Sequence, residues 1–406
     1  MASLLGLRGT GDWGTDERPK NFRQSILWNE PNGMAPLLAL MGRVGDESVD
    51  DPEFAWWEEI LTLTKVTVNG ALSSSATTVV VDSGALNLVQ GDLLEVAVEH
   101  AAGTAAYAAE LVQVAANPTG DTSFIVTRGA AGSTAASISD DAVLVKIGSA
   151  FEEGSAAPRA STRNPTKYSN YTQIFKTSYE MTRTAERTNL RTGDPVTTDK
   201  KRKMSDHSVA LEQALLFGRK SEGTGPNGKP LRYMGGLLSF LSTNNYTFSG
   251  TGTGTAGTDW NEDNFIAKLS RLFDYNSPSG DERLCFVGNS GLIALNRLAR
   301  GSSSTRINFN GVVKTYGMAM TEWILPQGRL LIKTHPLFSQ HPILDEAMIA
   351  VAPGALKYRY LRGRDTKFED DIQAKGDDTR KGQWITEASL EVHHEYTMGY
   401  FGNLGG

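Results

Sequence analysis

The sequence predicts an α+β protein built from several parts, and three observations support that prediction. Residues 196–218 have the apolar spacing of a long helix, and residues 388–398 alternate apolar and polar side chains over an unusually long strand. Residues 62–148 are rich in small and β-branched side chains, which is typical of short strands. A long helix beside a long strand indicates an elongated, plate-like subunit. At 406 residues the chain exceeds one ordinary core, so two or three domains are expected.

The N-terminal part, residues 1–62, mixes glycine, aspartate, proline and bulky apolar residues without sustained periodicity. This predicts an extended arm that ends in a short amphipathic piece at 54–61. Exposed tryptophans are costly in a monomer, so Trp56 and Trp57 are candidate anchors at a subunit contact. Burial against the same chain is an equal alternative. The apolar stretch 34–41 is shorter than the ~20 residues that a membrane helix needs, so no membrane partner is expected.

The stretch from 62 to 148 predicts a small all-β insert carried on an extended loop. Its low charge and many small side chains suit a packed module more than a binding cleft, and it holds no catalytic cluster. Its β-prone runs, separated by turn residues, are 77–81, 93–98, 124–127 and 143–147.

The segment 196–218 carries the clearest helical pattern. We expect Gly218 to end this helix in a left-handed cap, and the helix to span roughly 33 Å at 1.5 Å per residue. One mostly apolar stripe is formed by Met204, Ser208, Leu211 and Leu215.

Four basic residues occupy the first turns of this helix, where they oppose the helix dipole. They are Lys200, Lys201, Arg202 and Lys203. The unfavourable placement predicts acidic residues of a neighbouring subunit, or packaged DNA, near this end. The four residues are therefore candidate subunit-contact residues. A formal net charge of −6 gives no strong basic field, so sequence-specific nucleic-acid binding is not expected.

Residues 259–355 alternate helix and strand and predict a compact α/β unit. Asp259 begins a capping box ahead of an amphipathic helix, and a strand at 284–287 leads into a second helix that ends at Gly301. Cys285, the only cysteine, lies in this apolar strand and is predicted to be a core residue. A lone cysteine excludes intrachain disulfides and cysteine-based zinc clusters.

The C-terminal alternation at 388–398 predicts a strand of roughly 36 Å, well beyond the usual five or six residues. On such a strand His393 and His394 would point to opposite faces, so they could not hold a metal together.

Three motifs with catalytic associations are weak. Residues 252–257 match the dinucleotide glycine pattern, but a polar segment precedes them where a buried strand is required. Residues 223–229 have phosphate-loop spacing, yet Pro230 replaces the metal-binding hydroxyl and indicates a turn. Ser290 lacks the second glycine of a nucleophile elbow and is interpreted as a helix N-cap. We expect no enzyme activity, and no catalytic, metal or cofactor-binding residues.

The order of these parts, with several specific stretches, resembles the major capsid (major head) protein family of tailed bacteriophages. The stretches are 126–133 (VTRGAAGS), 151–155 (FEEGS), 170–175 (NYTQIF), 211–218 (LEQALLFG), 234–238 (MGGLL) and 387–392 (EASLEV). The resemblance implies the tailed-phage major capsid fold, with an N-arm, an extended loop, a peripheral domain with a long spine helix and long strands, and an α/β axial domain. The expected parts are the arm at 1–62, the extended loop with its β insert at 63–150, the peripheral domain at 151–235, the axial domain at 236–345, and the return to the peripheral domain at 346–406.

The resemblance also implies a function. Many copies would assemble as hexamers and pentamers of an icosahedral shell around double-stranded DNA, held by non-specific contacts. A separate scaffolding protein and a portal are expected partners, with a decoration protein as a further one. The protein would be part of the virion capsid and would assemble in the bacterial host cytoplasm.

Two alternatives remain at this point. One is an encapsulin-like shell around cargo protein, and the other is a β-rich extracellular fibre or adhesin protein. Under the main interpretation, removal of residues 1–45 is expected to leave a folded protein that does not assemble.

Overall fold

The computed structural model describes residues 35–60, 64–97, 110–160, 162, 164–188, 190, 193–248, 260–301, 309–315 and 318–404. The chain forms two compact units, Met1–Trp56 with Tyr168–Gly406, and Trp57–Lys167. It passes between them through two paired strands, β2 (Glu53–Glu58) and β9 (Thr166–Tyr171). The amphipathic piece predicted at 54–61 is therefore mostly strand, and the two tryptophans alternate between a buried and an exposed side.

A helix, α1 (Pro36–Val44), occupies part of the sequence predicted to be an extended arm. Proline at the first helical position suits its fixed φ, and Leu37, Leu40 and Met41 follow a helical spacing. All three are fully buried in the main core. A helix of 9 residues is marginal alone, so this packing stabilises it. The prediction of an extended chain here is wrong because the apolar run was too short to indicate a helix by itself.

The unit Trp57–Lys167 is a small antiparallel β-barrel, which confirms the all-β insert. Its strands follow the order β3-β8-β5-β6-β7-β4. The end strands meet at the Val68–Val81 bridge, and the Asn69 amide donates to the Val80 carbonyl at 2.9 Å, so the sheet closes on itself. The strands are β3 (Lys65–Thr67), β4 (Thr78–Val80), β5 (Asp92–Ala97), β6 (Leu111–Val114), β7 (Ser123–Thr127) and β8 (Val143–Ser149).

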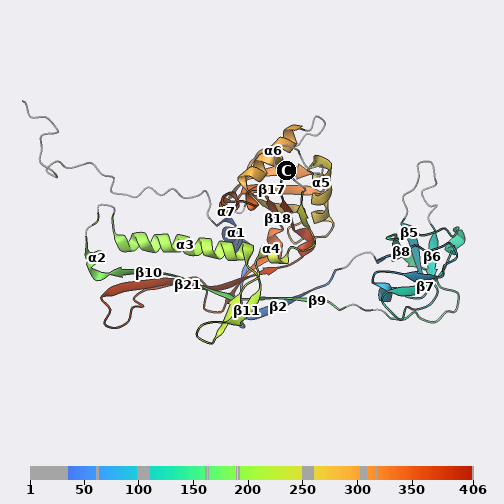
Figure 1. Ribbon diagram of the computed structural model, residues 1–406, viewed down its shortest axis with the longest axis horizontal. Helices are drawn as coiled ribbons and strands as arrows, with labels where there is room; N and C mark the ends of the chain where they lie inside the picture. Colours follow the sequence, from blue (N-terminus) through green and yellow to red (C-terminus); the bar gives the residue numbers. More distant parts are fainter. Residues whose placement is uncertain are drawn as a thin grey trace, which may run out of the picture. The chain divides into compact units, whose positions relative to one another are not determined.

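In the other unit, a five-stranded sheet and one long helix, α3 (Pro195–Phe217), form a platform in which α3 lies along β10 and β21 (Figure 1). The sheet order is β1-β19-β21-β10, and β20 also pairs with β21. The strands are β1 (Asp46–Val49), β10 (Gln173–Thr182), β19 (Leu356–Leu361), β20 (Lys367–Glu369) and β21 (Thr379–Val392).

Helix α3 confirms the helix predicted at 196–218. Asp194 caps it by accepting a hydrogen bond from the Thr197 amide at 3.0 Å, and Pro195 begins it. The predicted stripe is only half right, because Met204 is 38% exposed. The buried face instead includes two polar residues, His207 and Glu212, whose partners lie in other elements.

The left-handed cap predicted at Gly218 is wrong, since its φ is −52°. Glycine is needed there for another reason. A Cβ on Gly218 would lie 2.5 Å from the Met234 carbonyl oxygen and 2.6 Å from that of Ala214. The chain at 234–236 therefore passes directly against the end of the helix, and only glycine permits the approach.

Strand β21 is unusually long, as predicted, but its position differs. It spans 14 residues, about 47 Å, and ends at Val392 rather than 398. His394 adopts a left-handed φ of 53° and opens a 3₁₀ turn, Glu395–Thr397, which stops the strand. Ser389 and Glu391, predicted on a polar face, are both buried because the sheet is covered there. Since neither His393 nor His394 lies in the strand, the argument about opposite faces does not apply.

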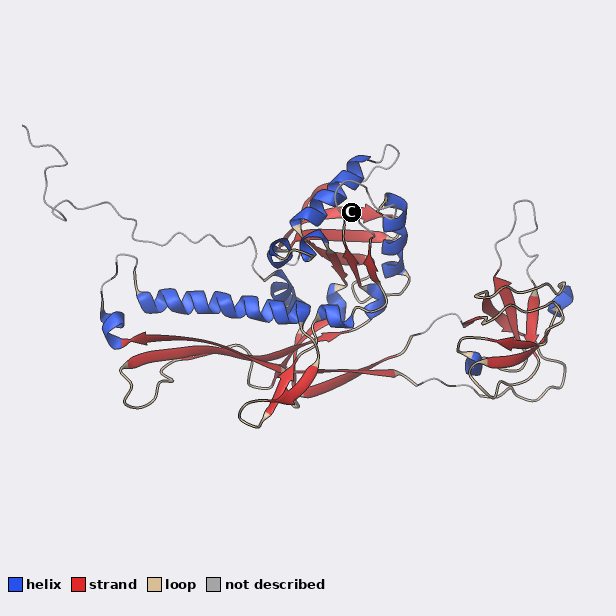
Figure 2. Ribbon diagram, viewed as in Figure 1, coloured by secondary structure: helices blue, strands red, loops and turns tan. Residues whose placement is uncertain are grey.

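A seven-stranded mixed sheet forms the rest of this unit, in the order β13-β22-β18-β14-β17-β16-β15 (Figure 2). Its strands are β13 (Asn245–Thr247), β14 (Glu282–Val287), β15 (Phe309–Thr315), β16 (Met318–Leu325), β17 (Gly328–Thr334), β18 (Met348–Val351) and β22 (Gly399–Gly402). Residues 346–406 thus supply strands to both sheets, so the boundary predicted at 345 does not separate them.

Central strand β14 is buried on both faces and joins two cores. Leu284 and Phe286 pack into the core shared with the platform, whereas Cys285 and Val287 face the core under α5 and α6. Cys285 is confirmed as a core residue, and burial raises the pKa of its thiol to about 12. The shorter helices are α2 (Arg183–Arg187), α4 (Leu237–Phe240), α5 (Glu262–Ser270), α6 (Asn289–Gly301) and α7 (Pro336–Gln340).

Two predicted caps are wrong in detail. Asn261, not Asp259, caps α5 by accepting from the Asn264 amide at 2.8 Å, and Asp259 lies outside the described residues. Ser290 lies inside the first turn of α6, where its hydroxyl donates to the Asp345 carboxylate. Residues 223–229 fall in a hairpin, β11 (Ser221–Thr224) and β12 (Pro230–Tyr233), which confirms a turn. The glycine motif at 252–257 lies outside the described residues.

Candidate subunit-contact surface

The basic run on α3 has most of its acidic partners within the same chain. The Lys200 ammonium lies 3.0 Å from an Asp370 carboxylate oxygen and 4.4 Å from the centre of the Phe368 ring. Within the helix, Lys203 pairs with Asp206 at 3.1 Å and Arg202 with Asp199 at 3.7 Å, while Lys201 is exposed. A neighbouring subunit is therefore not required to compensate Lys200, although Lys201 and Arg202 still present positive charge outward.

Asp370 is the centre of this polar cluster at the start of α3. It accepts hydrogen bonds from Arg380 at 2.9 Å, from Lys200 at 3.0 Å and from the Tyr179 hydroxyl at 3.0 Å. The Arg380 hydrogen bond, with those from Lys200 and Tyr179, holds the pKa of the Asp370 carboxyl well below its usual range despite partial burial. Because Arg380 also bonds Glu186 at 2.8 Å, the cluster ties α2, α3 and both long strands together.

His207 holds the middle of α3 against the sheet. Its ring lies between two threonine hydroxyls, with Nδ1 3.1 Å from Thr177 of β10 and Nε2 2.7 Å from Thr386 of β21. The ring is buried, and desolvation lowers the pKa of the imidazole. His207 thus fixes the helix to the two long strands as a neutral hydrogen-bonding residue.

Glu212, one turn and a half further along α3, forms a fully buried polar cluster. Its carboxylate accepts from the backbone amides of Leu37 at 2.8 Å and Leu38 at 2.7 Å, at the start of α1. It also contacts His335 Nε2 at 2.9 Å, and both side chains are fully buried. Since His335 Nδ1 accepts from the Leu337 amide, Nε2 carries the proton and donates to Glu212. One carboxylate therefore joins α1, α3 and α7.

The edge strand β1 is attached by a row of charged residues. Glu47 accepts from Lys357 at 2.9 Å and also bonds Arg359, which in turn bonds Glu391 of β21. Burial alone would raise the pKa of Glu391, but hydrogen bonds from His393 and Arg359 outweigh it and lower the pKa to about 2. The row fixes the chain immediately after α1.

The two candidate tryptophans have different environments. Trp56 is buried, with its ring stacked on those of Phe54, Tyr168 and His393 at centroid distances of 6.0–6.1 Å. The alternative of burial within the same chain is therefore correct for Trp56. Trp57 is 62% exposed and remains a predicted contact residue.

A groove that sequence reasoning missed lies beside the start of α3. Its volume is about 380 Å³, and Leu190 at its rim is 48% exposed. Arg202, one of the four predicted basic residues, forms part of its wall. The other lining residues are Met181, Ala185, Thr188, Pro195, Thr198 and Asp199.

Within the described part of the chain, no group of three or more histidine, cysteine, aspartate or glutamate side chains is placed to hold a metal ion. Among those same residues, no helix is both long and apolar enough to span a membrane.

The family model described as SU10 major capsid protein matches residues 8–405. The major capsid protein of Pseudomonas phage PaMx41 is 28% identical over 361 residues, covering 88% of this chain and 82% of that protein. Similar solved structures include the capsid of an empty GTA particle, with 10% identity, TM-score 0.44 and 95% coverage of both chains. The structure titled Mycobacterium phage Bobi has 7% identity, TM-score 0.43 and 95% coverage of both chains.

The holo-SrpI encapsulin complex from Synechococcus elongatus PCC 7942 has 12% identity and TM-score 0.40, covering 60% of this chain and 77% of that one. The assignment rests on the family match, which extends over nearly the whole sequence, and the resemblance to phage major capsid proteins is confirmed. The chain belongs to the SU10 major capsid protein family.

Proposed function

We propose that this structural subunit of an icosahedral phage head assembles as hexamers and pentamers around double-stranded DNA, and that it has no enzyme activity. Family membership is the observation that supports this proposal most directly. The platform suits the role, because buried clamps at His207 and Glu212 fix α3 to the sheet and to α1 and α7.

The contacts between subunits are proposed to use the exposed residues at the two places described above. Trp57 supplies an aromatic anchor, and Lys201 and Arg202, beside the groove at Leu190, supply positive charge with an apolar edge. Trp56 and Lys200 are not proposed as contacts, since Trp56 is buried and the Lys200 side chain is less exposed than that of Arg202.

Substitution tests this assignment. Trp57→Ala and the double variant Lys201→Gln, Arg202→Gln should each leave the urea midpoint of the unassembled protein unchanged but lower the yield of shells. Lys229→Gln, an exposed basic residue in the β11–β12 turn, is the charge control. Shell yields equal to wild type for both sets, counted by negative-stain imaging, would refute the proposed contacts.

The further partners are proposed from the family. We propose a separate scaffolding protein, a portal and a decoration protein, with assembly in the bacterial host cytoplasm and non-specific contact with the packaged DNA. The nucleic acid content of purified particles separates this from an encapsulin-like shell, which would contain cargo protein in place of DNA. Particles that hold protein cargo and no DNA would overturn the proposal.

A test of the N-terminal arm must use a shorter deletion than residues 1–45, because α1 lies within that range. Removal of residues 1–45 would delete α1, whose apolar residues are in the core and whose amides bond Glu212. We therefore expect that deletion to unfold the protein. Removal of residues 1–34 preserves every contact described for α1, and we propose that it gives a folded protein that assembles poorly.

A further inference from the structure

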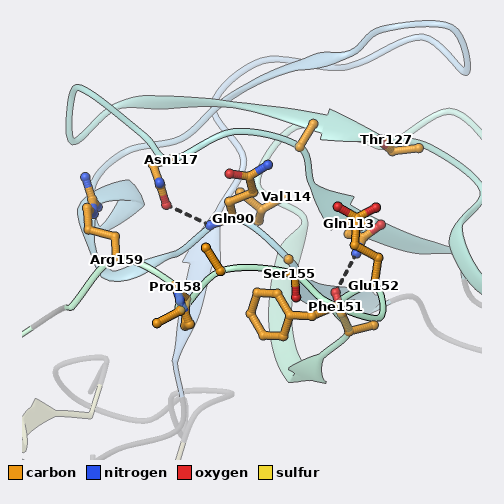
Figure 3. A pocket seen from close by; sticks show the side chains of 15 residues that line it. Gln90, Gln113, Val114, Asn117, Thr127, Phe151, Glu152, Ser155, Pro158 and Arg159 are labelled. Atoms are coloured by element: carbon orange, nitrogen blue, oxygen red, sulfur yellow. Dashed lines mark hydrogen bonds between the residues drawn. The ribbon is translucent and has the colours of Figure 1, made fainter.

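The barrel unit, Trp57–Lys167, carries a cleft that shell formation does not explain. The cleft lies against the outside of the barrel, and its volume is about 660 Å³ (Figure 3). One wall is the chain from 150 to 159, which has no helix or strand and crosses beside β6. The opposite wall is formed by the turn before β5 and by the end of β6.

The walls of the cleft are built by specific contacts. The Gln113 side chain donates to the Ala150 carbonyl at 3.0 Å, and the Gln90 amide donates to the Asn117 side chain at 2.9 Å, both drawn in Figure 3. The Arg159 guanidinium donates to the Pro118 carbonyl at 3.1 Å. The Gln113 and Arg159 bonds attach the two ends of the 150–159 segment to the barrel, and the Gln90–Asn117 bond joins two loops of the opposite wall.

Phe151 stands in the cleft with its ring over Gly91. A Cβ on Gly91 would lie 2.6 Å from the Phe151 ring, and the φ of Gly91 is +92°, so glycine alone fits beneath this ring. The side chain is 49% exposed although an apolar core lies within the same barrel. An aromatic ring held half-exposed by its neighbours presents a flat apolar surface to a ligand.

Polar side chains line the cleft around this ring. Among the residues that the structure describes in this unit, the lining includes the exposed side chains of Gln90, Thr127, Glu152 and Ser155. Their amide and hydroxyl groups both donate and accept, whereas the carboxylate only accepts. Arg159 is the only cation in the lining, and Glu152 offsets its charge, so a phosphate or other polyanion does not fit.

We propose that this cleft binds a neutral saccharide. A pyranose ring presents C–H groups on one face and hydroxyls around its edge, which matches an aromatic ring with amide, hydroxyl and carboxylate groups beside it. Phe151 lies under the C–H face, and Gln90, Thr127 and Glu152 bond the hydroxyls. The volume accommodates one or two sugar units. The site does not depend on how subunits contact one another in the shell.

Saturation-transfer NMR on the full-length protein tests the proposal. The probes are neutral monosaccharides and disaccharides of glucose, galactose, mannose and N-acetylglucosamine, with a neutral bacterial surface polysaccharide as a second arm and heparin as the charged control. Phe151→Leu removes the aromatic surface, whereas Phe151→Trp preserves it. Val80→Ala, an exposed apolar residue on the same barrel but outside the cleft, is the matched control.

We expect binding of a neutral sugar that weakens at least roughly tenfold in Phe151→Leu, as for other aromatic contacts removed from a binding site. Phe151→Trp and Val80→Ala should bind as the wild type does. Transfer to the polysaccharide alone would assign the ligand to a cell surface, and transfer to the disaccharides as well would assign it to sugars in general. Binding of heparin only, no binding in either neutral arm, or equal binding by Phe151→Leu would each overturn the proposal.

Discussion

Replacement of Glu212 by alanine should destabilise the subunit more than almost any other single change on α3. The carboxylate is fully buried and accepts hydrogen bonds from two α1 amides and from His335. In Glu212→Ala, the amides of Leu37 and Leu38 and the imidazole N–H lose their acceptor in a site without solvent. A buried donor left unsatisfied costs about 1–3 kcal/mol.

Three donors would together cost about 3–9 kcal/mol, and relaxation at the α1 end, with entry of water, should reduce this to about 3–5 kcal/mol. Glu212→Gln should cost less, about 1–3 kcal/mol, because its carbonyl oxygen still accepts while its NH₂ group faces a donor. Asp206→Ala, an exposed acid on the same helix, should change the free energy of unfolding by less than about 0.5 kcal/mol.

Urea denaturation of the unassembled full-length protein measures these differences. Limited proteolysis adds a local readout, since cleavage within α1 should accelerate in Glu212→Ala before cleavage elsewhere does. The reasoning is refuted if Glu212→Ala lies within about 1 kcal/mol of wild type, or if Asp206→Ala is equally destabilised.

Three further predictions follow from the same contacts. Desolvation lowers the pKa of His207 below the unfolded value near 6.5, so the unfolded chain binds more protons than the folded protein at acid pH. The free energy of unfolding should therefore fall as the pH drops below about 6.5, and it should fall less steeply in His207→Gln. Urea midpoints measured across this pH range test the prediction. Gly218→Ala places a methyl group 2.5 Å from the Met234 carbonyl and should lower stability by about 2 kcal/mol or more in thermal melts. Cys285, buried with its pKa raised to about 12, should react with a thiol reagent only as fast as the protein unfolds.

Much of the fold was predictable because its signals are local. The long helix has a proline start, an aspartate cap and a recurring apolar face, and it lies within one residue of the predicted bounds. The sequence of the insert contains β-prone runs separated by turn residues, and four of its six strands coincide with those runs. These features depend on neighbours in the sequence, so periodicity and capping chemistry suffice to find them.

The remainder depends on contacts between distant residues. The barrel closes through the Val68–Val81 bridge, which neither strand indicates alone. The predicted bounds of strand β21 lay too far toward the C-terminus for two reasons. Its first half, from Thr379, has mixed side chains without clear alternation. At its end, His394 takes a left-handed conformation that no residue pattern requires. The Glu212 cluster joins residues 123 and 175 positions apart, so no window of sequence contains it.

For the basic run on α3, the sequence indicated that compensating negative charge was needed but not where that charge would come from. Four positive charges near a helix N-terminus require compensation, and that inference was sound. The negative charge that compensates them was predicted to come from another molecule. The Asp370 cluster and two acidic residues on α3 supply most of that negative charge. Fewer of the four basic residues are therefore candidates for contact with a neighbouring subunit than the sequence suggested. Lys201 and Arg202 are exposed beside an apolar groove, and we propose that this surface binds an acidic, partly apolar partner rather than a DNA backbone, which would offer charge alone.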